Sequence, residues 1–320
     1  MASIKSRNNG EILLGSFQNN TEQESAQPQK TPKIFLVLFK MLMSFVSRMY
    51  IAGMIKSVSR VLEKNLRSVT SAMLRTFLRG PIVTIGDIKY YLSDRRLESF
   101  FTLSSEYVKY VWNYFKPARG DVFVDVGAHI GKYALQVARI VGDEGRVIAL
   151  EPHLGNFRAL LKGIQLNGFR NITALNVAAW DRECKLQLFI GDASTYHSAK
   201  IDRGLGYIDV QAQTIDQIIA ELRIKHVDWI KIDVEEAEIE VLRGLRKTLS
   251  TYAPRLIVEV QWKYLKEFLM LMENYQYMVK PIEGEQNPRD RFGYYYCIPL
   301  LTRATNWYQN IEGRRAHSML

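Results

Sequence analysis

The stretch Asp121–Tyr133, DVFVDVGAHIGKY, is followed by the apolar run RVIAL, which ends on Glu151. In the first stretch, β-branched apolar residues lead into a glycine turn and then into a helical pattern. This order predicts a strand, a helix and a second strand. Such a β-α-β unit belongs to an open α/β sheet, in which ligands bind beyond the carboxyl ends of the parallel strands. Asp125 and Glu151 both fall at that edge.

The glycine turn and the second carboxylate together predict a nucleoside site. Gly127 and Gly131 allow the backbone to approach a ligand closely, and the helix that begins near Gly131 presents unpaired backbone N–H groups. Glu151 is placed to accept hydrogen bonds from the hydroxyls of a ribose. We therefore expect a nucleoside with a reactive group attached. The alternative is an ordinary strand-turn-helix in which the two acids are incidental.

The turn lacks the residues that a bound pyrophosphate needs. A dinucleotide fingerprint has the pattern G-x-G-x-x-G, whereas His129 and Lys132 stand at its second and third glycine positions here. A phosphate-binding G-x-x-x-x-G-K-[ST] loop does not occur either. A ligand without phosphate fits better, and S-adenosylmethionine is the commonest such nucleoside cofactor. A nucleotide-dependent dehydrogenase is the weaker alternative.

The rest of the chain alternates between predicted helices and strands. We expect helices at 105–115, 156–167, 214–222, 236–249 and 263–273. Further strands are expected at 172–177, 227–233, 255–260, 277–282 and 294–300, with an inserted hairpin at 185–190 and 207–213. This alternation predicts a doubly wound, largely parallel sheet that helices cover on both faces.

The composition suits a globular protein without a disulfide framework. The chain has 320 residues, 47% of them hydrophobic, which allows one large α/β domain with an extension or two small domains. Cys184 and Cys297 lie in apolar runs and are expected to pack as small apolar residues in a reducing compartment. The histidines are scattered and show no zinc-type spacing with cysteine, so no metal is expected.

The positive charge is concentrated ahead of the α/β pattern. The whole chain carries a net charge of +10, and residues 1–80, with 12 Lys/Arg and 4 Asp/Glu, account for most of it. The remainder of the chain is close to neutral. Because a nucleic-acid-binding core would favour a basic face, the core is not expected to bind nucleic acid.

Two segments precede the α/β pattern. Residues 1–33 are polar and are predicted to be a disordered tail, and residues 34–80 a basic, amphipathic helical extension. Within it, residues 51–69 place apolar side chains on one helical face and four lysines and arginines on the other. Such a helix can bind an anionic membrane surface, or it can pack on its own domain or on a second subunit.

The same segments predict where in the cell the protein lies. The apolar segment Ile34–Ile55 contains two basic residues, which argues against a membrane span, and the tail before it is too long for a signal peptide. We expect a cytoplasmic protein. Peripheral association with the inner face of the membrane through residues 34–69, or self-association through them, stays open.

A second group of carboxylates lies in Asp233–Glu240, DVEEAEIE, at the start of the helix expected at 236–249. Acidic residues stabilise a helix N-terminus by interacting with its dipole, and this can account for Glu236. Asp233 lies instead at the carboxyl edge of the sheet. An acid there can orient an acceptor hydroxyl or take its proton.

Five segments of the chain resemble FkbM-type S-adenosylmethionine-dependent methyltransferases. In order, they are DVGAHIGKY, VIALEPH, IQLNGFRNITALNVAAWD, WIKIDVEEAEIEVLRG and PRLIVEV. The resemblance implies a Rossmann-like class I methyltransferase fold, with a doubly wound, mostly parallel seven-stranded sheet, and S-adenosylmethionine as cofactor. The methyltransferase domain is predicted at 117–302, after a lead-in strand and helix segment at 81–116 and before a C-terminal tail at 303–320.

The resemblance also assigns residues to the site. The cofactor-binding residues that it implies are Asp125, Gly127, His129, Gly131, Glu151, Asn176, Ala178 and Ala179. Its acidic box corresponds to Asp233, Glu235 and Glu238. Glu236 replaces the glycine that is usual in this box, and Gln261 follows the fifth strand where a histidine often stands.

Methyl transfer to a hydroxyl requires alignment of the acceptor with the methyl donor and a general base for the proton. The candidate catalytic residues are Asp233, Glu235 and His197. His197 and Ser198 lie in the inserted hairpin, where a loop can select the substrate. Ser198 and Glu238 are the candidate substrate contacts.

The expected function is O-methylation of a hydroxyl on a glycan, a lipid-linked sugar or a small metabolite. One alternative is an RNA methyltransferase that uses the basic N-terminal region as a phosphate-binding arm. Another is a protein without turnover that binds the cofactor or acts as a membrane-associated scaffold.

Overall fold

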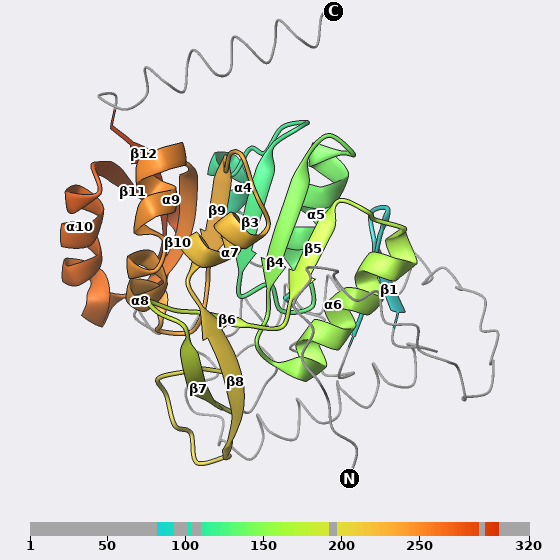
Figure 1. Cartoon of the computed structure of the whole chain (residues 1–320), viewed down its shortest axis with the longest axis horizontal. Coiled ribbons are helices and arrows are strands. Elements are labelled where there is room, and N and C mark those ends of the chain that lie inside the picture. The colour runs from blue at the N-terminus through green and yellow to red at the C-terminus, as the bar shows by residue number, and fades with distance from the viewer. Residues whose placement is uncertain (1–81, 93–101, 104–109, 192–196, 288–291, 301–320) are drawn as a thin grey trace, which may run out of the picture. The chain divides into compact units, whose positions relative to one another are not determined.

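The computed structural model describes residues 82–92, 102–103, 110–191, 197–287 and 292–300 (Figure 1). The predicted tail at 1–33, the helical extension at 34–80 and the C-terminal tail at 303–320 lie outside these residues. None of the helices in the described part of the chain combines the length and the hydropathy that crossing a bilayer requires.

A seven-stranded sheet lies at the centre of the described chain. In spatial order its strands are β11 (Tyr277–Asn287), β12 (Phe292–Pro299), β10 (Arg255–Gln261), β9 (Trp229–Ile232), β3 (Val122–Val126), β4 (Arg146–Leu150) and β5 (Ile172–Leu175). The strands from β10 to β5 pair in parallel, and β12 pairs antiparallel with both β10 and β11. The predicted doubly wound, mostly parallel seven-stranded α/β fold is confirmed.

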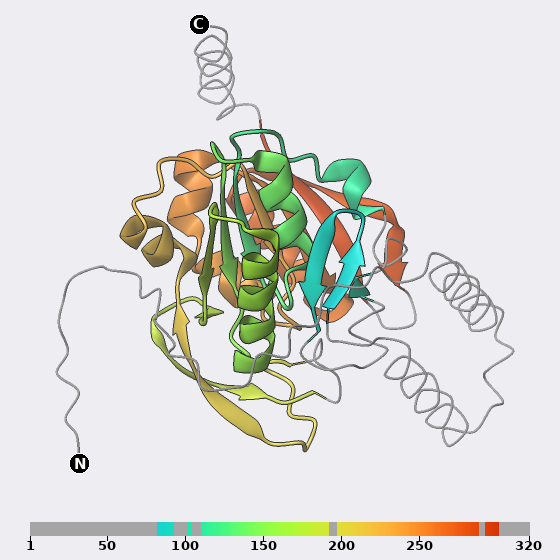
Figure 2. The ribbon, with the colours of Figure 1, turned by 90° about the vertical axis from the view of Figure 1, so that its right-hand side faces the viewer.

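Helices cover both faces of this sheet (Figures 1 and 2). One buried cluster joins the sheet to α4 (Val111–Tyr114), α5 (Lys132–Val141) and α6 (Leu154–Asn167). The other joins it to α7 (Ile215–Glu221), α8 (Glu238–Arg243), α9 (Arg246–Tyr252), η2 (Trp262–Tyr264) and α10 (Leu265–Asn274). Along β3, Phe123 belongs to the first cluster and Val124 to the second. Strands buried on both faces read as continuous apolar runs for this reason.

The inserted hairpin forms a small sheet of its own. β7 (Cys184–Phe189) pairs antiparallel with β8 (Tyr207–Gln213), as predicted, and β6 (Ala178–Ala179) pairs with the other edge of β8. In Figure 1 the hairpin extends away from the central sheet. Cys184, at its start, and Cys297, on β12, are both free thiols, as expected.

Two of the helix boundaries lie where the sequence predicts them, one at a side-chain cap and one at a glycine. Thr214 accepts a hydrogen bond from the N–H of Gln217 at 3.0 Å, and the Gln217 side chain accepts one from the Thr214 N–H at 3.1 Å. This reciprocal cap starts α7. Gly168 ends α6 in the left-handed conformation, with φ +68°.

The lead-in hairpin, β1 (Ile82–Ile85) and β2 (Ile88–Tyr91), is fastened to the end of α6. The Asn167 side chain accepts a hydrogen bond from the backbone N–H of Lys89 at 2.9 Å and donates one to its carbonyl at 2.7 Å. The lead-in strands therefore pack on the helix that follows β4.

The helix expected after the acidic box is instead two helices, α8 and α9. A Cβ at Gly244 would lie 1.9 Å from the backbone oxygen of Trp180, so the chain passes too close to that loop for a larger residue. Asp216 then accepts a hydrogen bond from the N–H of Thr248 at 2.7 Å, in the first turn of α9. Helical periodicity could not reveal either contact, because both join segments far apart in sequence.

Candidate functional site

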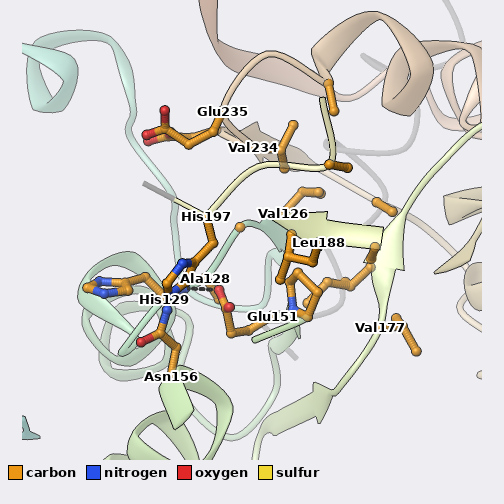
Figure 3. A pocket seen from close by; sticks show the side chains of 18 of the residues that line it. Val126, Ala128, His129, Glu151, Asn156, Val177, Leu188, His197, Val234 and Glu235 are labelled. Atoms are coloured by element: carbon orange, nitrogen blue, oxygen red, sulfur yellow. Dashed lines mark hydrogen bonds between the residues drawn. The ribbon is translucent and has the colours of Figure 1, made fainter. Parts of the chain in front are cut away.

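A cavity lies at the carboxyl ends of β3, β4 and β9, beside the inserted sheet. Figure 3 shows His129, Glu151, Asn156 and His197 together on its wall. Glu235 lies apart from them, in the turn 233–237 between β9 and α8, which we call the acidic turn. The predicted site residues that line it are Gly127, His129, Glu151, Ala178, Ala179, His197, Asp233 and Glu235. The fold thus brings the glycine turn and the acidic box to one place.

Gly127 makes this convergence possible. Its φ is +78°, and a Cβ there would lie 1.9 Å from the backbone oxygen of Asp233. The turn after β3 therefore lies directly against the residue that follows β9. The sequence predicts close approach of a ligand at this glycine, and the structure adds a close approach of two strand ends.

Glu151 is held at the end of β4 by backbone donors. Its side chain is 6% exposed, and its two oxygens accept hydrogen bonds from the N–H groups of His129 at 2.8 Å and His153 at 2.9 Å. Burial raises the pKa of this carboxyl to about 7, against the effect of the two hydrogen bonds. Each carboxylate oxygen has a further lone pair, so a fixed Glu151 can still accept hydrogen bonds from a diol.

Asp125, predicted to bind the cofactor, is not among the residues that line the cavity. Strand register sets Asp125 beside Lys231, whose Nζ lies 4.0 Å from an Asp125 oxygen and 3.1 Å from an oxygen of Asp233. Burial raises the pKa of the Asp125 carboxyl to about 6, an effect that Lys231 reduces. The side chain is only 1% exposed, so its influence on the cavity passes through Lys231.

Lys231 was missed by reasoning from sequence, although a signal was present. It is the charged residue in the strand WIKI, and charged side chains are rarely buried without a partner. Burial by itself lowers the pKa of its ammonium, yet the carboxylates of Asp233 and Asp125 raise the pKa above its ordinary value. A permanent positive charge therefore lies at the floor of the cavity.

Asp233 receives two hydrogen bonds on the same oxygen, Oδ2. Lys231 Nζ donates one at 3.1 Å and the Tyr294 hydroxyl donates the other at 3.0 Å. Burial opposes ionisation of Asp233, but Lys231 and these two hydrogen bonds hold its pKa below the usual value. Asp233 is therefore an oriented anion.

Three carboxylates meet beside the cavity. Oxygens of Asp233, Glu235 and Glu259 all lie within 4.8 Å of one another. Burial and the charge of Asp233 raise the pKa of both Glu235 and Glu259 well above their usual range. Carboxylates this close share a proton or bind a hard cation. Glu259 was missed from sequence, although it is the charged residue in the β10 segment LIVEV.

Glu238 and Ser198, the predicted substrate contacts, form hydrogen bonds to the backbone of the acidic turn. Glu238 is 2% exposed and accepts hydrogen bonds from the N–H groups of Val234 at 3.2 Å and Glu236 at 3.3 Å. The Ser198 hydroxyl is buried and donates to the carbonyl of Glu235 at 2.6 Å. Neither side chain is on the cavity wall, because the unsatisfied backbone groups of the turn engage both of them.

Two predicted cofactor residues also lie away from the cavity wall. Asn176 is exposed and donates hydrogen bonds to the carbonyls of Glu151 at 2.8 Å and Pro152 at 2.9 Å, which fixes the loop after β4. At Gly131, where φ is +93°, a Cβ would lie 2.7 Å from a methyl carbon of Leu160. This glycine supplies the left-handed conformation at which α5 begins, and it lies against Leu160 of α6.

The histidines at the cavity are neutral at neutral pH. Burial lowers the pKa of His129 to about 3 and that of His197 to about 4. His197 Nδ1 accepts a hydrogen bond from the N–H of Gly191 at 3.0 Å, and its ring centroid lies 4.1 Å from that of His153. His197 is therefore a weak base that can still act as a hydrogen-bonding wall of the cavity.

Glu236 occupies a glycine-like backbone conformation, with φ +82°, and forms an ion pair with Lys263. A non-glycine residue in that region costs roughly 1–3 kcal/mol, whereas an exposed ion pair contributes about 0–1 kcal/mol. We expect Glu236→Gly to raise the free energy of unfolding by about 1 kcal/mol in urea titrations. Lys263→Met, which removes only the ion pair, is the matched control. A loss of stability in Glu236→Gly larger than in this control would show that backbone strain is not the dominant effect.

Comparison with known proteins places this site in context. Residues 125–279 match the family described as the methyltransferase FkbM domain. "Methyltransferase 1" of Beauveria bassiana (strain ARSEF 2860) is 24% identical over 166 residues, which cover 45% of this chain and 66% of that protein. The chain therefore spans just under two thirds of the length of this relative.

Solved structures with a similar chain path include methyltransferase FkbM from Methylobacillus flagellatus KT. It is 19% identical, with a TM-score of 0.43, and the match covers 58% of this chain and 45% of that one. Fibrillarin from Aeropyrum pernix in complex with S-adenosyl-L-methionine is 16% identical, with a TM-score of 0.41 and coverage of 69% and 83%.

Proposed function

Because residues 125–279 belong to the methyltransferase FkbM domain family, we propose that the protein transfers a methyl group from S-adenosylmethionine to a hydroxyl group. The acceptor that we propose is a glycan, a lipid-linked sugar or a small metabolite. One observation carries the proposal: the cavity joins a fixed carboxylate, Glu151, to an anionic turn at Asp233 and Glu235. A diol-binding acid and a proton-accepting acid are what this reaction requires.

The residues present fit the cofactor. Glu151 would accept hydrogen bonds from the ribose hydroxyls, and the buried Ala178 and Ala179 would offer an apolar wall to the adenine. When bound, S-adenosylmethionine supplies a methyl group on a positively charged sulfur. Asp233, held as an anion at the same cavity, would complement that charge.

Of the three candidate bases, we assign proton transfer to Glu235. Asp233 is a weak base because Lys231 and Tyr294 stabilise its ionised form. His197 is a weak base because burial lowers its pKa to about 4. Glu235 lines the cavity, and its raised pKa makes it the strongest base of the three candidates. The acceptor oxygen would bond to the methyl carbon as the carbon–sulfur bond breaks, and its proton would pass to Glu235.

The alternative is a protein that binds the cofactor without catalysing a reaction. The reason for considering it is Glu236, which replaces the usual glycine of the acidic box. With Glu236 in a glycine-like conformation, the turn can keep its shape despite the substitution. Its side chain is paired with Lys263 and takes no part in the cavity wall. This favours catalysis over a scaffold role, and no feature of the described residues specifically favours RNA as the acceptor.

Calorimetric titration with S-adenosylmethionine tests the proposal. If the ribose hydroxyls need an ionised Glu151, affinity must rise as the pH rises through its pKa of about 7. Only the ionised fraction binds, so the apparent Kd should fall roughly tenfold between pH 6 and pH 8. In Glu151→Gln, binding should be weaker and independent of pH over this range.

This variant also separates Glu151 from a second group. Burial lowers the pKa of Lys132, on the cavity wall, to about 7 as well. A pH dependence that persists in Glu151→Gln would therefore belong to Lys132 and would remove the role given to Glu151. Wild-type protein that binds no S-adenosylmethionine at either pH would overturn the proposed function.

A further inference from the structure

A tyrosine of β12 donates a hydrogen bond to the acidic turn. Tyr294 lies on β12, outside residues 125–279 that match the family, and is 1% exposed. Strand register places it opposite Glu259 on β10. Its hydroxyl reaches past that strand to donate a hydrogen bond to Asp233 Oδ2 at 3.0 Å.

The carboxylate that accepts this hydrogen bond lies close to two other acidic side chains, which disfavour its ionisation. Oxygens of Glu235 and Glu259 lie within 4.8 Å of oxygens of Asp233. Carboxylates at this separation disfavour each other's ionisation, so the ones that stay charged are those with the best donors. Two donors reach Asp233 Oδ2, the ammonium of Lys231 and the Tyr294 hydroxyl, and the Glu259 side chain also forms a hydrogen bond with Asp233 that lowers its pKa.

The two donors also fix the direction of the side chain. Both reach the same oxygen, Oδ2, from two different strands, so the carboxylate is held in one orientation beside the cavity that Asp233 lines. A single donor would leave rotation about the side-chain bonds less restricted. Precise orientation of groups around a reacting centre is a large part of catalysis.

We propose that Tyr294 is a positioning residue for the methyl transfer proposed above, holding Asp233 anionic and oriented beside the general base Glu235. The effect of Tyr294 on catalysis rests on the proposed function. The hydrogen bond itself is independent of that function. The C-terminal strand therefore completes the site that the family-matched segment begins.

The tyrosine run on β12 offers a matched control. Tyr294 faces the cluster that contains α5, whereas Tyr295 faces the opposite side of the sheet, where its ring centroid lies 5.5 Å from that of Phe268. Both are almost fully buried. Tyr294→Phe and Tyr295→Phe each remove one hydroxyl from the same strand, and only the first touches Asp233.

The direct test is carbon-13 NMR of full-length protein labelled at the aspartate carboxyl carbon, with Asp233→Asn to assign the resonance. In wild type and Tyr295→Phe, the Asp233 signal should remain that of an ionised carboxylate down to pH 4. In Tyr294→Phe, the proton affinity of Asp233 should rise about tenfold. The other titratable groups around Asp233 are the same in both variants: Asp125, His129, Lys132, Tyr133, Lys231, Glu235, Glu238 and Glu259.

A kinetic test uses transfer of a tritiated methyl group from S-adenosylmethionine to a glycolipid extract. Tyr294→Phe should lower kcat about tenfold with little change in the KM for S-adenosylmethionine, and Tyr295→Phe should leave both unchanged. Thermal unfolding of both variants checks that the fold is intact. A loss of kcat together with wild-type titration of Asp233 would overturn the positioning role.

Two other results would also be decisive. Identical titration of Asp233 in wild type and Tyr294→Phe would overturn the inference. A change of the Asp233 signal on addition of Mg²⁺ alone, unaffected by Tyr294→Phe, would show that a cation fixes the carboxylate instead. Absence of S-adenosylmethionine binding would overturn the proposed function and leave the NMR result to stand by itself.

Discussion

Glu235→Gln is expected to lower kcat by about 10²–10⁴-fold while the Kd for S-adenosylmethionine stays within a few-fold of wild type. Glutamine keeps the size of the side chain but cannot take the proton of the acceptor hydroxyl. The loss should therefore fall on the chemical step. The measurement is transfer of a tritiated methyl group to the acceptor found by screening glycolipid extracts.

The pH dependence of the wild type belongs to the same prediction. Burial and the charge of Asp233 raise the pKa of Glu235 well above its usual range, and the base works only when it is deprotonated. The rate should therefore rise with pH, with a midpoint well above roughly pH 4.3, where an ordinary glutamate titrates.

The neighbouring Glu236 is the matched control. Its carboxylate is paired with Lys263 and does not line the cavity, so Glu236→Gln should retain activity within a few-fold. Equal losses in Glu235→Gln and Glu236→Gln would indicate a general effect on the turn. Retained activity in Glu235→Gln, with a large loss in His197→Ala, would transfer the base role to His197.

Lys231→Met is expected to lower the free energy of unfolding by about 3–5 kcal/mol at neutral pH. The substitution removes the ammonium that lies between Asp125 and Asp233 and leaves one buried and one partly buried carboxylate without this counter-charge. Methionine keeps most of the length of the side chain beside the Tyr133 ring, which lies 4.9 Å from the ammonium. Urea unfolding monitored by tryptophan fluorescence measures the change.

The pH dependence of this loss has a definite sign. Without Lys231, the pKa of Asp125, already raised by burial, rises further, and the pKa of Asp233 moves above its value in the unfolded chain. Such groups add stability at low pH and lose it as the pH rises through the folded-state pKa. The difference between wild type and Lys231→Met should therefore shrink in acid and grow toward neutral pH.

Lys185→Met is the control, because it replaces a lysine that is exposed to solvent. Lys185 is exposed on β7, and its replacement should change stability by no more than about 0.5 kcal/mol. A loss below about 1 kcal/mol in Lys231→Met would mean that water reaches Asp125 and Asp233 and that their burial is not a significant cost.

Much of the fold was accessible from the order of apolar runs and glycine turns. Strand-helix alternation predicted the parallel strands and both helical layers, and Thr214 and Gly168 marked helix ends that the structure places at the same residues. Local patterns carry this information because hydrogen bonding and capping act over a few residues. The break between α8 and α9 was missed because it depends on Trp180 and Asp216, which are distant in sequence.

The assignment of roles within the site was less accessible. Asp125, Ser198 and Glu238 all lie near the predicted site, yet none lines the cavity: Asp125 lies beside Lys231, and the other two bind backbone groups of Glu235 and Val234. Lys231 and Glu259 are the charged residues of the apolar runs WIKI and LIVEV, and that pattern was a signal that they would meet other charges. No signal in the sequence pointed to Tyr294, because its partner, Asp233, follows β9, a strand two positions away in the sheet.

The edge at which Gly127, Glu151 and Asp233 gather could be read from the chain, since the carboxyl ends of parallel strands always meet at one edge of a sheet. Which acids face the cavity was decided only by folding. Side chains alternate between the two faces of a strand, and register with the neighbouring strands determines which partner each one meets. For this reason Glu151 reaches the cavity wall, whereas Asp125, one strand away at the same edge, is buried against Lys231.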